Sequence, residues 1–141
     1  MHDSQGVAYD CRYAVVWCTK YRRKVLREEI ACRLEDILTS VAGEINAQIT
    51  DLQIFSEIVR MRISIDPQFG INRAVRHLKS VSSRILRSEF PELKSRIPCL
   101  WTGNYFVVTE ASVRNMEPLI KEFIRKQERS QRKSTTKQEE V

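Results

Sequence analysis

The feature that most constrains the fold of this chain is a strict alternation of apolar and polar residues near its centre. Side chains of a β-strand point alternately to its two faces, so such a segment predicts a strand with one buried and one polar face. A second apolar and β-branched segment, Ile49–Phe55, precedes it and predicts a neighbouring strand. The alternating segment reads Val59-Arg60-Met61-Arg62-Ile63-Ser64-Ile65.

Helical patterns flank this pair of strands. Apolar residues recur at helical spacing through 26–45 and 71–86, with charged residues between them. Two more strands are predicted at Tyr13–Thr19 and Tyr105–Thr109, and a last helix from about Ser112 to Arg129. The order strand, helix, strand, strand, helix, strand, helix predicts an α+β fold. We expect a ferredoxin-like split βαβ antiparallel sheet with helices on one face and an added C-terminal helix.

Length and composition further limit which kind of protein this chain can be. A chain of 141 residues can build one domain, which we place at 1–127, followed by a polar tail at 128–141 that we expect to be disordered. No apolar run reaches the ~20 residues of a membrane span, and the first ten residues lack a signal-like apolar stretch. We therefore expect a cytoplasmic protein, at the nucleoid when bound to DNA, with no membrane partner. The four cysteines show no metal-binding spacing, and the net charge of +6 suits a polyanionic partner.

Four segments in order carry a resemblance to a known family. They are a strand with a basic turn (Tyr13–Leu26), a helix and its exit (Leu78–Leu93), a strand lead-in (Leu100–Val107) and a final helix (Leu119–Gln127). Together they resemble the single-tyrosine HUH transposases, which include TnpA-like and REP-associated insertion-sequence enzymes. The resemblance covers roughly residues 9–127 and implies an ancestor that cut and rejoined single-stranded DNA.

The same resemblance implies a site that has lost its chemistry. In the family, two histidines on the third strand hold Mg²⁺ or Mn²⁺, and a tyrosine on the last helix attacks the phosphate. Here those positions carry Ile58 and Arg60 on the strand and Phe123 on the helix, whereas a metal-assisting glutamine is kept as Gln127. Phe has no hydroxyl for a covalent phosphotyrosine bond, and one amide does not hold a divalent cation. We therefore predict no metal, no cofactor and no catalytic residue, and the balance favours a protein that is not an enzyme.

Basic residues mark the surfaces that would contact DNA. The turn 20–24 is the densest cluster and contains a tyrosine that could stack on a base. Arg60 and Arg62 share the strand face of the lost metal site, where a guanidinium could hold a phosphate. A solvated surface is the alternative for each group, including the basic helix face that also carries Arg73 and Arg87. The predicted DNA-binding residues are Lys20, Tyr21, Arg22, Arg23, Lys24, Arg60, Arg62, Arg76, Lys79, Ser83 and Arg84.

The sequence thus favours an inactive transposase relative that binds hairpin or single-stranded DNA as a regulator, an accessory subunit or a domesticated factor. Family resemblance implies a homodimer, and an active transposase or another element-encoded protein is a further possible partner. One alternative is an active nickase-ligase with a shifted nucleophile or an active partner subunit. The other is a protein-interaction module that no longer binds DNA.

Overall fold

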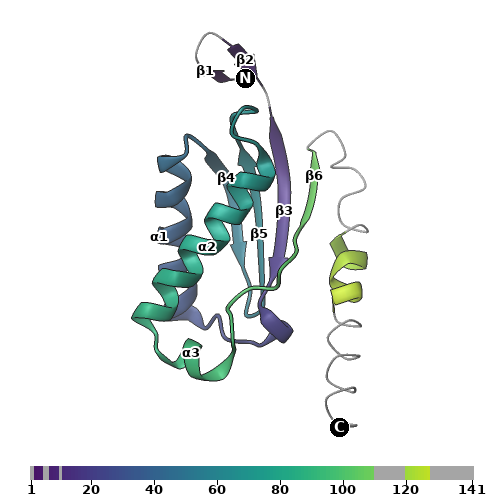
Figure 1. The fold of residues 1–141 in the computed structure, drawn as a ribbon. Coiled ribbons are helices and arrows are strands. Elements are labelled where there is room, and N and C mark those ends of the chain that lie inside the picture. Colours follow the sequence, from purple (N-terminus) through teal and green to yellow (C-terminus); the bar gives the residue numbers. More distant parts are fainter. Residues whose placement is uncertain (1, 5–6, 10, 110–119, 128–141) are drawn as a thin grey trace.

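The centre of the fold is a four-stranded antiparallel sheet (Figure 1). The computed structural model describes residues 2–4, 7–9, 11–109 and 120–127. The sheet has the spatial order β4-β5-β3-β6. The two strands predicted near the centre of the chain therefore pair as neighbours, and the strand predicted at Tyr13–Thr19, which corresponds to β3, lies inside the sheet. This arrangement confirms the predicted α+β sheet. Its strands are β3 (Arg12–Cys18), β4 (Gln48–Ile54), β5 (Ile58–Ser64) and β6 (Phe106–Thr109).

Two long helices cover one face of this sheet (Figure 1). They are α1 (Glu28–Glu44) and α2 (Ile71–Glu89), and they match the two predicted helical patterns. A short helix, α3 (Glu92–Arg96), follows α2, and a 3₁₀ turn, η1 (Lys20–Arg22), follows β3. Within the described residues, no helix combines the length and apolar character needed to cross a bilayer.

At the two ends of the chain, the structure either differs from the predicted elements or does not describe the residues that the prediction concerns. A small hairpin of β1 (His2–Ser4) and β2 (Val7–Tyr9) precedes the sheet and was not predicted. The predicted last helix is present at residues 120–127, while its expected start at Ser112 lies outside the described residues. The predicted tail, 128–141, also lies outside them.

The main core lies between the sheet and the two long helices. Side chains of alternate sheet residues, such as Val15, Trp17 and Met61, are buried against apolar residues of α1 and α2. The Trp17 ring meets Trp101 edge-on, with ring centroids 5.8 Å apart. This burial fixes the register of the strands, because a slip by one residue would turn every apolar side chain toward the opposite face.

A bulge in β4 decides which of its side chains face that core. Ile49 pairs with Ile63 and Asp51 pairs with Arg62, so Thr50 is the extra residue between two consecutive pairs. The bulge brings Leu52 onto the core face together with Ile49, although three positions separate them. As a result, Asp51 takes a place on the opposite face of the sheet, the face turned away from α1 and α2.

Candidate nucleic-acid interface

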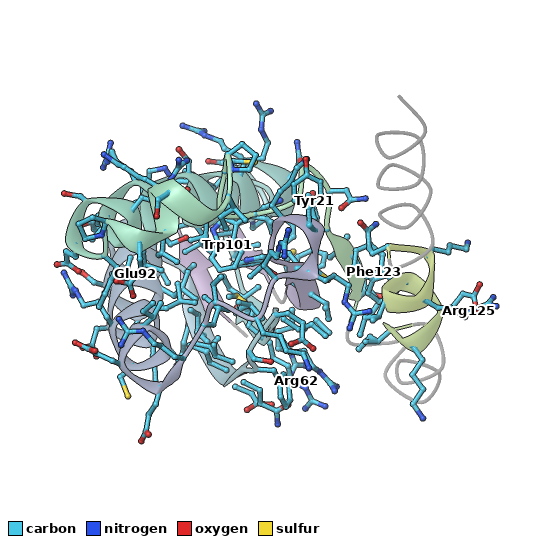
Figure 2. The ribbon with its side chains drawn as sticks, turned by 90° about the horizontal axis from the view of Figure 1, so that it is seen from below. Tyr21, Arg62, Glu92, Trp101, Phe123 and Arg125 are labelled. Carbon is cyan, nitrogen blue, oxygen red and sulfur yellow. The ribbon has the colours of Figure 1, made fainter. Side chains whose placement is uncertain are left out.

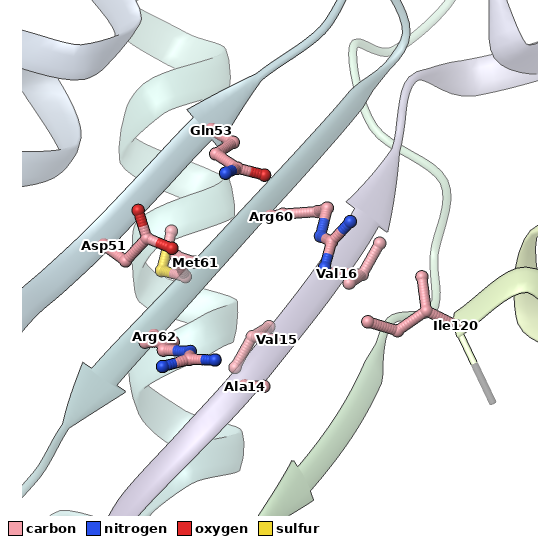
Figure 3. A pocket seen from close by; sticks show the side chains of 9 residues that line it. All are labelled: Ala14, Val15, Val16, Asp51, Gln53, Arg60, Met61, Arg62 and Ile120. Carbon is pink, nitrogen blue, oxygen red and sulfur yellow. The ribbon is translucent and has the colours of Figure 1, made fainter. Parts of the chain in front are cut away.

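The face of the sheet turned away from α1 and α2 carries a pocket of about 230 Å³ (Figure 3). Its floor is formed by β3, β4 and β5, and Ile120 of the last helix borders it. Polar side chains come from β4 and β5, whereas the β3 side and the helix supply apolar ones. The lining residues are Ala14, Val15, Val16, Asp51, Gln53, Arg60, Met61, Arg62 and Ile120.

The strand register places the polar groups of this pocket in two facing pairs. Gln53 of β4 lies opposite Arg60 of β5, and Asp51 lies opposite Arg62. Side chains that face each other across antiparallel strands have Cβ atoms only about 4.5–5.5 Å apart. Figure 3 shows Arg60 extending across the pocket toward Val16, its partner on β3. The pocket therefore presents two guanidinium groups, a carboxylate and a carboxamide from rigid strands.

The positions that resemble a catalytic centre are filled by an apolar cluster beside this pocket. Ile58 and Phe123 belong to one cluster with Phe106, and the two phenyl rings lie with centroids 5.5 Å apart and planes tilted by 41°. In Figure 2, Phe123 points from the last helix toward the sheet, while Arg125 points away. The structure thus brings Ile58, Arg60 and Phe123 to one face of the sheet.

These residues do not fit the divalent cation that the resemblance implies. An isoleucine in an apolar cluster offers no ligand atom, and the guanidinium of Arg60 repels a cation. Gln127, at the last described position of the helix, is half-buried and brings one amide oxygen. Across the described ranges of the chain, no three His, Cys, Asp or Glu side chains gather in a way that could hold a metal ion.

The basic turn after β3 is held in an unusual backbone conformation. Tyr21 has φ 58° and Arg22 has φ 50°, two consecutive left-handed residues that are not glycine. The Thr19 hydroxyl donates to the Arg23 carbonyl at 2.8 Å, and Arg22 forms an ion pair of 3.6 Å with Glu57. These contacts hold the turn while the Tyr21 side chain remains exposed (Figure 2). The Lys20 ammonium lies 5.2 Å from the centre of that ring.

The predicted DNA-binding residues of α2 do not form one group. Arg76 and Arg84 are exposed and Ser83 is half-buried. These residues belong to the helix on the far side of the sheet, so they do not join the pocket of Arg60 and Arg62. The structure corrects the prediction for Lys79, which is only 9% exposed. Its ammonium donates to the carbonyls of Thr102 at 2.6 Å and Asn104 at 3.0 Å, so Lys79 ties α2 to the segment that leads into β6.

Sequence reasoning missed Asp51 and Gln53. A strand that alternates strictly from Ile49 would turn Asp51 toward the core, so neither residue was a candidate for the polar face. The signal that could have found them is the change of phase between Ile49 and Leu52, two apolar residues separated by an odd number of positions. Such a change in an otherwise alternating strand indicates a bulge.

Comparison with known proteins agrees with this architecture. Residues 7–127 match the family described as IS200-like transposases. The chain is similar to the ISDra2 transposase TnpA of Deinococcus radiodurans, with 30% identity over 90% of this chain and 91% of that protein. It is also similar to the transposase of the IS200 element of Salmonella typhimurium, with 26% identity over 77% and 75% of the two chains.

Solved structures show the same fold. A crystal structure assigned to the transposases of Deinococcus radiodurans has a TM-score of 0.81 and 32% identity, and it covers 90% of this chain and 98% of its own. A REP-associated tyrosine transposase bound to a REP hairpin has a TM-score of 0.53 and 12% identity over 77% of this chain and 62% of its own. The second likeness concerns the fold alone.

Proposed function

Because the chain belongs to the IS200-like transposase family, we propose that it binds hairpin or single-stranded DNA without cutting it. The observation that carries this proposal is the apolar packing of Ile58, Phe106 and Phe123 at the positions where a metal and a nucleophile would act. A phenyl ring cannot attack a phosphate, and no water is activated by an apolar cluster. The fold is retained while its reacting groups are replaced.

The neighbouring guanidinium groups supply a reason for DNA to bind at this place. Arg60 and Arg62 project from one face of β5 into the pocket. A guanidinium holds a phosphate through two parallel hydrogen bonds and needs no metal to do so. The exposed Lys24 and Arg23 of the basic turn would contact further phosphates. A regulator or accessory subunit of a transposition system is the role that suits such a protein; homodimer formation and a cytoplasmic location stay predictions.

The test of this proposal separates binding from cleavage. Labelled hairpin, linear single-stranded and duplex DNAs are incubated with the protein, with Mg²⁺, with Mn²⁺ and with a chelator. We expect retention of hairpin or single-stranded DNA that the chelator does not change, with no nicked product and no covalent adduct. Phe123→Tyr should also give no adduct, because Ile58 and Arg60 still cannot hold a metal. An adduct or a nick made by the natural protein would contradict the proposal.

Salt titration tests the role of the two arginines. Each phosphate contact with a single strand contributes about 0.7 to the slope of log affinity against log salt concentration. Replacing both residues, as Arg60→Ala with Arg62→Ala, should therefore weaken binding and lower that slope by about 1.4. Lys94→Ala, which removes an exposed charge on α3, is the control and should change the slope little. An unchanged affinity and slope in the double variant would exclude the pocket from the DNA interface.

A further inference from the structure

The pocket contains a group that a simple phosphate clamp should not have. Asp51 places a carboxylate directly opposite Arg62, on the strand next to it. A carboxylate repels a phosphate, by about 1 kcal/mol at 4 Å even in water and by more in a partly buried site. Among the described residues, no hydrogen bond or ion pair of the Asp51 side chain is found. The side chain is exposed, and its acceptors point to the same face of the sheet as the guanidinium groups.

The position of Asp51 is set by the fold and not by a flexible loop. The bulge at Thr50 shifts the β4 register by one residue, and the Thr50 hydroxyl donates to the Arg62 carbonyl at 3.4 Å. Burial of Ile49 and Leu52 on the other face holds both sides of this bulge. A carboxylate acceptor and a guanidinium donor are therefore presented side by side on paired strands, which is the kind of support that a specific binding site needs.

We propose that this pocket binds an unpaired guanine base, with Asp51 accepting from its Watson–Crick edge and Arg62 donating to its O6 and N7 atoms. This inference rests on the proposed DNA-binding function. Arginine pairs with O6 and N7 of guanine through two hydrogen bonds. Of the four DNA bases, guanine alone also carries two adjacent N–H donors, at N1 and N2, that match the two oxygens of a carboxylate. Unpaired bases can be read along both of these edges.

The other walls of the pocket suit a flat ring. Val16 and Ile120 bring apolar surface beside the polar groups. A volume of about 230 Å³ leaves room for a purine together with part of its sugar-phosphate chain. Gln53 can both donate and accept, so it can contact the same base or the next sugar. In this arrangement Arg62 contacts the base and Arg60 alone contacts a phosphate, so the double variant Arg60→Ala with Arg62→Ala would lower the salt slope by about 0.7 and not by about 1.4.

The experiment asks whether Asp51→Asn weakens or strengthens binding to each DNA strand. The probes are fluorescein-labelled strands of fifteen dT residues in which the central residue is dT, dA, dC or dG, and affinity is measured by anisotropy at constant salt. We expect the full-length protein to bind the dG strand about tenfold more tightly than the others, the discrimination of one good two-hydrogen-bond contact. Asp51→Asn should reduce that preference, because the carboxylate contact to N1 and N2 is lost while the Arg62 contact to O6 and N7 stays, and it should not weaken binding of the other strands. Central inosine, which lacks the N2 amine, and central 7-deazaguanine, which lacks N7, should each lose part of it.

Each other outcome decides against the inference in a different way. If all strands bind equally and Asp51→Asn tightens all of them, the pocket is a phosphate clamp whose carboxylate only repels, and the proposed function stands without base recognition. If no strand or hairpin binds, both proposals are wrong. Asp36→Asn is the matched control, because it removes the same charge from an exposed position of α1 on the opposite side of the sheet. It should change neither the preference nor the general affinity.

Discussion

Removal of the Lys79 ammonium should destabilise the protein strongly. This ammonium lies at the buried side of α2 and donates to the carbonyls of Thr102 and Asn104. The Thr102 amide in turn donates to the Cys18 carbonyl at 3.1 Å, at the end of β3. One side chain therefore joins a helix, a strand end and the segment leading into β6. The substitution Lys79→Ala removes this link: the Thr102 carbonyl loses the Lys79 donor, and the Asn104 carbonyl keeps only the Thr102 hydroxyl at 3.4 Å.

The size of the effect can be worked from these contacts. A hydrogen bond to a charged group contributes about 1.5–3 kcal/mol, so two of them contribute about 3–6 kcal/mol. Burial opposes this gain, as the lowered pKa of the Lys79 ammonium shows. With that offset, we expect Lys79→Ala to lower the free energy of unfolding by about 2–4 kcal/mol, a large share of the ~5–15 kcal/mol of a typical domain.

Urea unfolding followed by tryptophan fluorescence is a suitable assay. Both tryptophans of the chain, Trp17 and Trp101, are buried, so their emission should change on unfolding. The midpoint should fall while the slope stays constant, since the surface exposed on unfolding is nearly the same. Arg76→Ala, at an exposed position three residues earlier on α2, is the control and should stay within about 0.5 kcal/mol. A loss below about 0.5 kcal/mol in Lys79→Ala would refute the assignment of this ammonium as a structural link.

Two further predictions concern pH and backbone strain. Burial lowers the pKa of Lys79 in the folded state below its ordinary value of 10.5, so between those two pKa values the unfolded chain binds more protons than the folded one. The stability of the natural protein relative to Lys79→Met should therefore rise as the pH approaches 10.5 from below, in paired urea titrations; a falling difference would contradict the sign. Tyr21→Gly should relieve the left-handed strain of its residue and raise the free energy of unfolding by about 1 kcal/mol, measured as a higher urea midpoint, while it weakens binding to single-stranded DNA. A lower midpoint would show that the turn is not strained.

The regular parts of this fold could be predicted from the sequence because burial imposes a period on it. The alternation of residues 59–65 matches β5, and the helical spacing of residues 26–45 and 71–86 matches α1 and α2. The same regularity assigned Arg60 and Arg62 to one strand face, and the structure places both there, whereas Ile58 was assigned to that face through the resemblance alone. A repeating pattern constrains many residues at once, so single exceptions do not hide it.

The parts that could not be predicted depend on single residues in three dimensions. Lys79 follows Leu78 on α2 and looks from its type like a member of the basic outer surface. Only the path of residues 102–104 across the helix brings two carbonyls to its ammonium and makes its burial possible. The segment that supplies those carbonyls lies more than twenty residues away in the chain. No local pattern around Lys79 carries that information.

The location of the pocket also depends on contacts between segments that lie far apart in the sequence. Among the described residues, the last helix packs through Ile120, Phe123 and Ile124 mainly against β3 and β6, and the polar side chains of β4 on the same sheet face stay exposed. Alternation along a strand tells which side chains share a face, but it does not tell how far across the sheet a helix extends. That extent separates an apolar cluster around Phe123 from the open polar groups near Asp51. The polar groups of this face that stay exposed are therefore those that residues 120–127 do not cover.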